Sequence, residues 1–250
     1  MVLDLVYNLS LLVALSVLSG FVDAHWPRSK LTGQILQGFL FAGVAVIGML
    51  RPFVFETGII FDGRSVVLSL CSFYFGPVAA LIACVPPTVC RIIQGGGGAV
   101  CGVLVICFSG LIGVTAWRLR ALGRLHPSAL TLWLFGVVVH LVMVACFLTM
   151  PPESVWKVMR QVAPPVLVIY PLATVVIGKV LHDQERSHSL LQELRDSQER
   201  YRSLLENMPD AVCRLTPDGT LTYVNKEYAK IFAAPGEDLV GKPIWGLIPE

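Results

Sequence analysis

The first 181 residues alternate between long apolar runs and short polar segments. A helix of about 20 apolar residues crosses the roughly 30 Å apolar core of a bilayer, and these runs have about that length. The pattern therefore predicts an α-helical integral membrane bundle of about six segments over residues 1–181. The six runs cover residues 3–22, 33–50, 65–87, 98–117, 129–149 and 162–181.

Beyond residue 181 the apolar residues recur at spacings of three and four. Mixed charges lie between them, as in a heptad repeat. This pattern predicts a signalling helix over residues 182–207 that forms a parallel coiled coil and joins two subunits as a homodimer. A single amphipathic helix packed on the next domain is the alternative. The seam consists of Leu191, Leu194, Gln198, Tyr201, Leu205 and Met208.

The last segment, residues 208–250, changes to a β-rich pattern. Two short strands at 211–216 and 220–225 flank Pro217-Asp218-Gly219, which is a strong hairpin signal. A short helix begins at Glu227. We therefore expect the start of an α+β domain after the coiled coil.

Composition agrees with a membrane protein, since the chain is 55% hydrophobic and 14% charged, against about 25% charged residues in soluble domains. A net charge of +2 gives no reason to expect nucleic-acid binding. None of the seven cysteines forms a CxxC pair, so we expect them to pack as small apolar side chains. The first four residues contain no Lys or Arg, which favours a retained helix over a signal peptide.

Positive charge between the fourth and fifth runs sets the predicted orientation. Arg118, Arg120 and Arg124 lie close together there, which places this loop in the cytoplasm. Counting segments from it puts the C-terminal tail and the amino terminus in the cytoplasm as well. The same count places the Asp62/Arg64 end of the third run inside and its Arg91 end outside. A re-entrant segment would move the amino terminus to the other side.

The third run has charged residues at both ends, which a pure anchor does not need. Arg64 and Arg91 are candidates for binding a small anionic ligand, because a guanidinium presents a fork of donors that fits a carboxylate. Asp62 is a candidate partner for Arg64. The alternative is that both arginines reach the headgroups from the ends of the helix. They can share one site only if the run is broken.

Other polar features of the membrane part have structural explanations. Gly76-Pro77 predicts a bend in the third run, and Gly95 to Gly98 predicts a tight turn. No Lys-Ser/Thr follows these glycines, so they are not a phosphate loop. His140 is expected to be a packing residue. We identify no catalytic centre and no metal-ligand spacing in the sequence.

The segment after the coiled coil resembles the opening half of a PAS sensor domain. The resemblance covers about 50 residues, without the strands that usually supply much of a PAS pocket, so the PAS ligand is unknown. It also implies that the sequence is a piece of a longer protein. The matching residues are Leu204, Leu205, Met208, Pro209, Asp210, Ala211, Asp218, Gly219, Val224, Asn225, Gly241 and Lys242.

The membrane part carries three motifs in register, namely Asp-x-Arg, Phe-Gly-Pro and Arg followed by a glycine run. Together they resemble the LytS-type five-transmembrane receptor domain of bacterial sensors. The motif positions are Pro52, Gly58, Asp62, Arg64, Phe75, Gly76, Pro77, Arg91, Gly95, Gly96, Gly97, Gly98 and Gly102.

This resemblance implies a sensory input module in the bacterial inner membrane. The expected output is a two-component histidine kinase that acts on a response regulator, with a diguanylate cyclase as the alternative. ATP and Mg are expected only for a kinase part beyond Glu250, and no cofactor is expected within the chain. A small transporter and a simple membrane tether are the alternatives from other functional classes.

Overall fold

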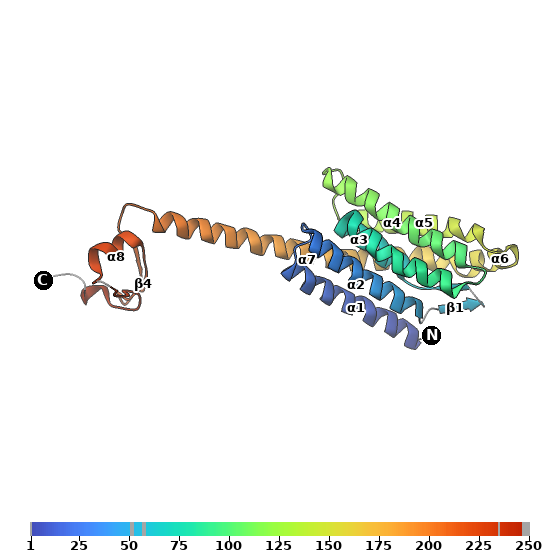
Figure 1. Ribbon diagram of the computed structural model, residues 1–250, viewed down its shortest axis with the longest axis horizontal. Coiled ribbons are helices and arrows are strands. Elements are labelled where there is room, and N and C mark those ends of the chain that lie inside the picture. The colour runs from blue at the N-terminus through green and yellow to red at the C-terminus, as the bar shows by residue number, and fades with distance from the viewer. Residues whose placement is uncertain (1, 51–52, 57–58, 235, 247–250) are drawn as a thin grey trace. The chain divides into compact units, whose positions relative to one another are not determined.

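The computed structural model describes residues 2–50, 53–56, 59–234 and 236–246 and divides the chain into two compact units, Met1–His188 and Ser189–Glu250. Gly58 and Pro52 of the predicted motif lie outside the described residues. The first unit contains α1 (Val2–His25), α2 (Leu31–Leu50), β1 (Phe53–Glu56), β2 (Ile59–Phe61), α3 (Arg64–Gln94), α4 (Ala99–Ala121), α5 (Ala129–Cys146), a 3-10 turn η1 (Phe147–Thr149), α6 (Pro152–Gln161) and the start of α7 (Ala163–Glu206). Figure 1 shows these elements along the chain.

The first unit is a membrane bundle, as the apolar pattern predicted. Within the described part of the chain, five helices are long and apolar enough to cross a bilayer, and these are α2, α3, α4, α5 together with its 3-10 extension, and α7. The first predicted run forms α1. The helix α6 between α5 and α7 is short and amphipathic, with Val158 fully buried and Trp156 exposed.

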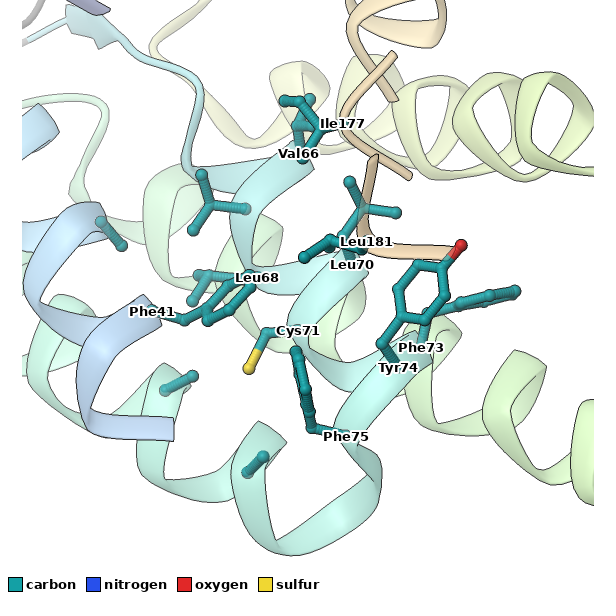
Figure 2. Close-up of a cluster of buried hydrophobic side chains, with 14 of the residues drawn as sticks. Phe41, Val66, Leu68, Leu70, Cys71, Phe73, Tyr74, Phe75, Ile177 and Leu181 are labelled. Atoms are coloured by element: carbon teal, nitrogen blue, oxygen red, sulfur yellow. The ribbon is translucent and has the colours of Figure 1, made fainter. Parts of the chain in front are cut away.

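The third run is not a straight helix. Gly76 interrupts it with a φ of 81° and a ψ of −169°, a left-handed conformation that glycine adopts at little cost. Figure 2 shows the ribbon turning directly after Phe75. A straight helix would hold Arg64 and Arg91 about 40 Å apart, yet both line the same cavity. The predicted bend at Gly76-Pro77 is confirmed, and it returns the chain to the end of the bundle where α3 began.

The first half of α3 is the centre of the bundle, because every residue from Arg64 to Gly76 is buried. Both neighbouring helices α2 and α4 pack along α3, and small residues allow the close approach. A Cβ on Gly113 of α4 would lie 2.5 Å from the carbonyl oxygen of Ser69. Two of its buried serine hydroxyls are satisfied locally, since Ser72 donates to the carbonyl of Leu68 at 2.8 Å and Ser69 to that of Val66 at 3.2 Å.

The broken helix corrects the predicted orientation. The second half of α1 meets α7 near residue 184, where the Gln184 amide donates to the carbonyl of Ser16 at 2.9 Å. At the other end of the bundle, Leu11 of α1 lies beside Arg64 and Tyr170 of α7 contacts Asp62. Both helices therefore run in the same direction, and the start of α1 lies at the end of the bundle opposite to the end where α7 leaves it. The count that put the amino terminus and the tail on one side does not hold, because α3 reverses at Gly76 and returns to the end where it began, as the re-entrant alternative allowed.

The same reversal changes the predicted position of the charged residues of the third run. Asp62/Arg64 and Arg91 were expected on opposite sides, but they lie together at one end of the bundle. At the other end, Arg28 from the loop after α1 and Arg120 from the last turn of α4 both pair with Glu185 of α7. These two arginines thus share the end from which α7 leaves the bundle.

The second unit contains the last part of α7, β3 (Cys213–Leu215), β4 (Leu221–Val224), α8 (Lys226–Phe232) and a 3-10 turn η2 (Ile244–Gly246). The two strands pair antiparallel, and Gly219 in the turn has a φ of 86°. Asn225 caps α8 by accepting the backbone N–H of Tyr228 at 2.9 Å. Its side-chain amide donates to the carbonyl of Asp210 at 2.8 Å. The predicted hairpin and helix are confirmed.

The predicted coiled-coil segment is helical as far as Glu206. Its apolar seam is exposed, with Leu191, Leu194 and Tyr201 between 54% and 66% accessible. Such a stripe is available to a second helix. The dimer and the domain boundaries at residues 181 and 207 stay predictions.

Candidate functional site

A small cavity lies at the end of the bundle where both ends of α3 meet. Its walls come from the start and the end of α3, the first turns of α4 and the end of α5. The cavity is lined by Asp62, Arg64, Ser65, Arg91, Gly98, Cys101, Gly102, Val105, Met143, Phe147 and Met150. The three charged residues that the sequence singled out are therefore brought together by the bend at Gly76.

Asp62 and Arg64 form a buried pair at the start of α3. Their side chains are 1% and 7% exposed, and Arg64 Nη1 lies 3.4 Å from Asp62 Oδ2. Asp62 Oδ1 also accepts the backbone N–H of Arg64 at 3.0 Å, which satisfies one of the free donors in the first turn of the helix. Neither Arg64 Nη1 nor Asp62 Oδ2 has a hydrogen-bond partner within the described residues.

Arg91 reaches the same cavity from the last turn of α3. It is only 2% exposed, so it does not extend to the headgroup level as the alternative interpretation required. Gly102 makes this position possible, because a Cβ there would lie 2.5 Å from Arg91 Nε. Gly95 and Gly96, with φ of 62° and 83°, make the tight turn that returns the chain into α4.

Three ionisable side chains line the cavity. They are the guanidinium groups of Arg64 and Arg91 and the carboxylate of Asp62, and all three residues are buried. Buried ionisable groups in membrane proteins are costly and usually mark a functional site. The two guanidinium groups are donors to which an anion can bind.

A hydrogen-bonded chain connects the cavity to α5 and α7. Ser65 Oγ lies 3.1 Å from His140 Nε2, and His140 Nδ1 lies 2.6 Å from the carbonyl oxygen of Gly136. Tyr170 of α7 contacts the His140 ring edge-on, with ring centroids 5.1 Å apart, and its hydroxyl donates to the Asp62 carbonyl at 3.4 Å. His140 is a satisfied packing residue, as predicted, but it also contacts a serine of the cavity wall.

The cavity leaves little free space between its lining side chains. Its volume is about 10 Å³, which is about the space that one water molecule needs. Met143 and Met150 form part of its wall, and methionine side chains adapt to irregular spaces more readily than other apolar residues. A ligand larger than water therefore requires these side chains to move.

A second charged cluster lies at the opposite end of the bundle, around Glu185 of α7. Glu185 pairs with Arg120 of α4 and, at 3.3 Å, with Arg28 from the loop after α1. Arg28 Nε also donates to Asp23 at 3.1 Å, and His182 Nδ1 lies 3.8 Å from Glu185. We call these five residues the Glu185 cluster.

The Glu185 cluster contacts the residues directly before the bend of α3. The guanidinium of Arg28 lies 5.0 Å from the ring centroid of Phe75, and that of Arg120 lies 5.2 Å from the ring of Tyr74, which are distances typical of cation–π contacts. The Tyr74 hydroxyl donates to the carbonyl of Gly178 in α7 at 2.7 Å. From the sequence, Arg120 was expected in a loop and Glu185 in the coiled-coil segment, because their pairing depends on the fold.

Replacing Glu185 by glutamine is expected to lower the free energy of unfolding of the first unit by about 1.5–3 kcal/mol. The reason is that two partly buried arginines lose their shared carboxylate. Detergent-based unfolding curves measure the change. Glu193→Gln, on the exposed part of the same helix, serves as the control and should change the free energy little. Equal effects of the two substitutions would contradict the role assigned to Glu185.

Comparison with known proteins adds three findings. A family described as the 5TMR of 5TMR-LYT matches residues 11–184, and the PAS fold family matches residues 199–250. A segment of 60 residues is 43% identical to the two-component sensor PprA of Pseudomonas aeruginosa. This segment is 24% of the chain and 6% of PprA, so the chain spans a small part of that relative. No solved structure matches the chain significantly.

Proposed function

Because the chain belongs to the 5TMR-LYT family and continues into a PAS fold, we propose that it is the membrane input part of a two-component sensor histidine kinase. The name of the relative PprA supports this output over a diguanylate cyclase. The order of membrane bundle, helix and PAS domain also suits a receptor better than a carrier. The kinase itself would lie in a further part of the protein. That part would bind ATP and Mg and would act on a response regulator.

The proposed stimulus is a small anion, most simply a carboxylate, bound between Arg64 and Arg91. The single observation that carries this proposal is that two buried arginines, Arg64 and Arg91, line one cavity. Arginine is suited to the task because its planar donors engage both oxygens of a carboxylate.

The proposed signal passes along the first half of α3 to α7. This half-helix joins Arg64 at the cavity to Tyr74 and Phe75 at the Glu185 cluster. A packed core transmits a small displacement as a rigid body rather than absorbing it. Movement of the bend would then shift Glu185, which lies in α7 shortly before the helix leaves the first unit.

We place the Glu185 end of the bundle in the cytoplasm of a bacterial cell. Five basic residues lie at this end, and positive charge near the ends of membrane helices stays inside. Arg28 and Lys30 lie in the loop after α1, Arg118 and Arg120 in the last turn of α4, and Arg124 in the loop after it. The tail that follows α7 is then cytoplasmic. A homodimer would form when the exposed seam of α7 pairs with a second copy.

Titration of the whole chain in lipid nanodiscs with acetate, propionate and lactate tests the anion site, with the uncharged amides as matched controls. We expect one or more carboxylates to bind and the amides to fail. Arg91→Gln should weaken binding by about tenfold or more, the effect expected when a charged hydrogen bond of about 1.5–3 kcal/mol is lost.

Two further variants make this result decisive. Arg91→Lys keeps the positive charge but loses the planar fork, so it should bind more weakly than the wild type. Arg124→Gln removes an arginine from the exposed loop after α4 and should leave binding unchanged. Binding that does not depend on Arg91, or no binding of any carboxylate, would contradict the proposed site.

A further inference from the structure

Helix α6 lies at the surface of the membrane, because it joins two membrane helices. Both α5 with its 3-10 extension and α7 are long and apolar enough to cross a bilayer, whereas α6 has ten residues, about half the length that a crossing needs. Met150, two residues before α6, lines the cavity. Figure 1 shows α6 at the end of the bundle opposite to the end from which α7 leaves it. Helix α6 is therefore placed at the level of the lipid headgroups.

The two faces of α6 have different surroundings. Val158 is fully buried, and Val155 and Met159 pack against the same apolar cluster. This cluster includes Met143 and Phe147 of the cavity wall, so one face of α6 supports the cavity. The other face is exposed, with residues spaced three and four apart as on one side of a helix. It consists of Glu153, Trp156, Lys157, Arg160 and Gln161.

Trp156 is an unusually exposed aromatic residue at this position. Its side chain is 73% exposed, which would be unfavourable in water for so large an apolar ring. The neighbouring surfaces are also apolar, since Leu148 before α6 is 65% exposed and Val168 of α7 is 61% exposed. Tryptophan is enriched where acyl chains meet headgroups, because its ring is apolar and its N–H is polar. The exposed face of α6 thus begins where the lipid-facing surface ends.

The exposed face of α6 is positively charged. Arg160 and Lys157 supply two positive charges against the one negative charge of Glu153, a net charge of +1. The guanidinium of Arg160 lies 5.9 Å from the ring centroid of Trp156, a distance typical of cation–π contacts. Trp156, Lys157, Arg160 and Gln161 also line a shallow, open hollow of about 430 Å³, a volume within the range of small-molecule sites. This lining is complementary to an anion that has an apolar part.

We propose that this face of α6 binds the headgroup of an anionic phospholipid, such as phosphatidylglycerol, in the leaflet at the cavity end of the bundle. Arg160 would engage two oxygens of the phosphate, and Lys157 would add attraction to the anionic surface. Trp156 would lie beside the upper part of the acyl chains. A zwitterionic headgroup binds less well, because its own cation offsets the phosphate. This inference goes beyond the proposed function and does not depend on a ligand in the cavity.

Quenching of Trp156 fluorescence by brominated lipids tests the site. The whole chain is placed in nanodiscs of phosphatidylcholine that contain a small fraction of brominated phosphatidylglycerol or, in the matched sample, the same fraction of brominated phosphatidylcholine. The chain has five tryptophans, so the contribution of Trp156 is the difference between the wild type and Trp156→Phe. We expect brominated phosphatidylglycerol to quench this contribution about fivefold more strongly, the enrichment that one basic side chain gives at an anionic surface.

Three variants show whether Arg160 is responsible for this preference. Arg160→Gln should reduce the quenching ratio of the two lipids to about twofold or less. Arg160→Lys keeps the charge and should retain most of the preference. Arg124→Gln removes an exposed arginine at the opposite end of the bundle and should leave the ratio unchanged. A merely structural role of Arg160 would change quenching by both lipids alike and would not change their ratio.

Three results would overturn the lipid site. They are equal quenching by the two lipids in the wild type, an unchanged ratio in Arg160→Gln, and no quenching of Trp156 by either lipid. The last result would mean that protein, such as a second copy of the chain, covers this face. The test is separate from the carboxylate titration, because Arg160 does not belong to the residues that line the cavity. Failure of either site would therefore leave the other standing.

Discussion

Replacing Asp62 by asparagine is expected to lower the free energy of unfolding by about 3–5 kcal/mol, the cost of removing one partner from a buried ion pair. Asparagine has nearly the same shape and can still accept the backbone N–H of Arg64, so the change removes mainly the charge. The buried guanidinium of Arg64 would then lose the carboxylate that lies 3.4 Å from its Nη1. Denaturant titration of the chain in mild detergent measures the loss.

Two comparisons make the Asp62 prediction specific. Asp62→Asn combined with Arg64→Met should recover part of the lost stability, because an apolar replacement of a whole buried pair is often neutral. Asp183→Asn breaks an exposed pair, because the side chains of Lys179 and Asp183 are 51% and 64% exposed. This substitution should cost less than about 1 kcal/mol of stability. If both aspartates gave the same small loss, Asp62 would not hold a buried charge pair.

Replacing Gly113 by alanine is expected to lower the free energy of unfolding by about 1–3 kcal/mol, the usual cost of overpacking a core. A Cβ at this position would meet Ser72 and would lie 2.5 Å from the backbone carbonyl of Ser69. Backbone atoms cannot turn away as a side chain can, so α4 must move off the first half of α3. Unfolding curves in detergent measure this effect.

Gly43 of α2 provides the matched control. It also lies within a helix of the bundle, but a Cβ there would meet nothing within 4 Å. Gly43→Ala should therefore leave the stability unchanged or raise it by up to about 1 kcal/mol through helix propensity. A loss as large as that of Gly113→Ala would mean that general helix effects, rather than the α3–α4 contact, determine the result.

Much of the fold is determined locally and could be predicted from the sequence. Apolar runs of the required length predict the membrane helices, because the bilayer leaves backbone groups no partner except within the helix. The Pro217-Asp218-Gly219 turn and the cap at Asn225 likewise depend on neighbouring residues. Arg64 and Arg91 could be selected as candidates because charge is rare in such runs.

The arrangement of the helices could be predicted only in part. Gly76-Pro77 indicates a bend, but neither residue determines how far the helix turns. That angle depends on contacts with distant residues, such as Arg28 against Phe75 and Arg120 against Tyr74. Counting each apolar run as one crossing therefore put the amino terminus and the tail at the same end of the bundle, whereas the reversal at Gly76 puts them at opposite ends.

The sequence by itself determined the class of the protein, the helical segments, the hairpin of the second unit and the charged residues worth testing. These follow from composition and from spacings of a few residues. Only the tertiary structure decided that Asp62, Arg64 and Arg91 share one cavity, that Ser65 contacts His140, and that Glu185 pairs with two arginines. Each of these contacts joins residues far apart in the chain, and a reversal at one glycine with positive φ brings both ends of α3 together.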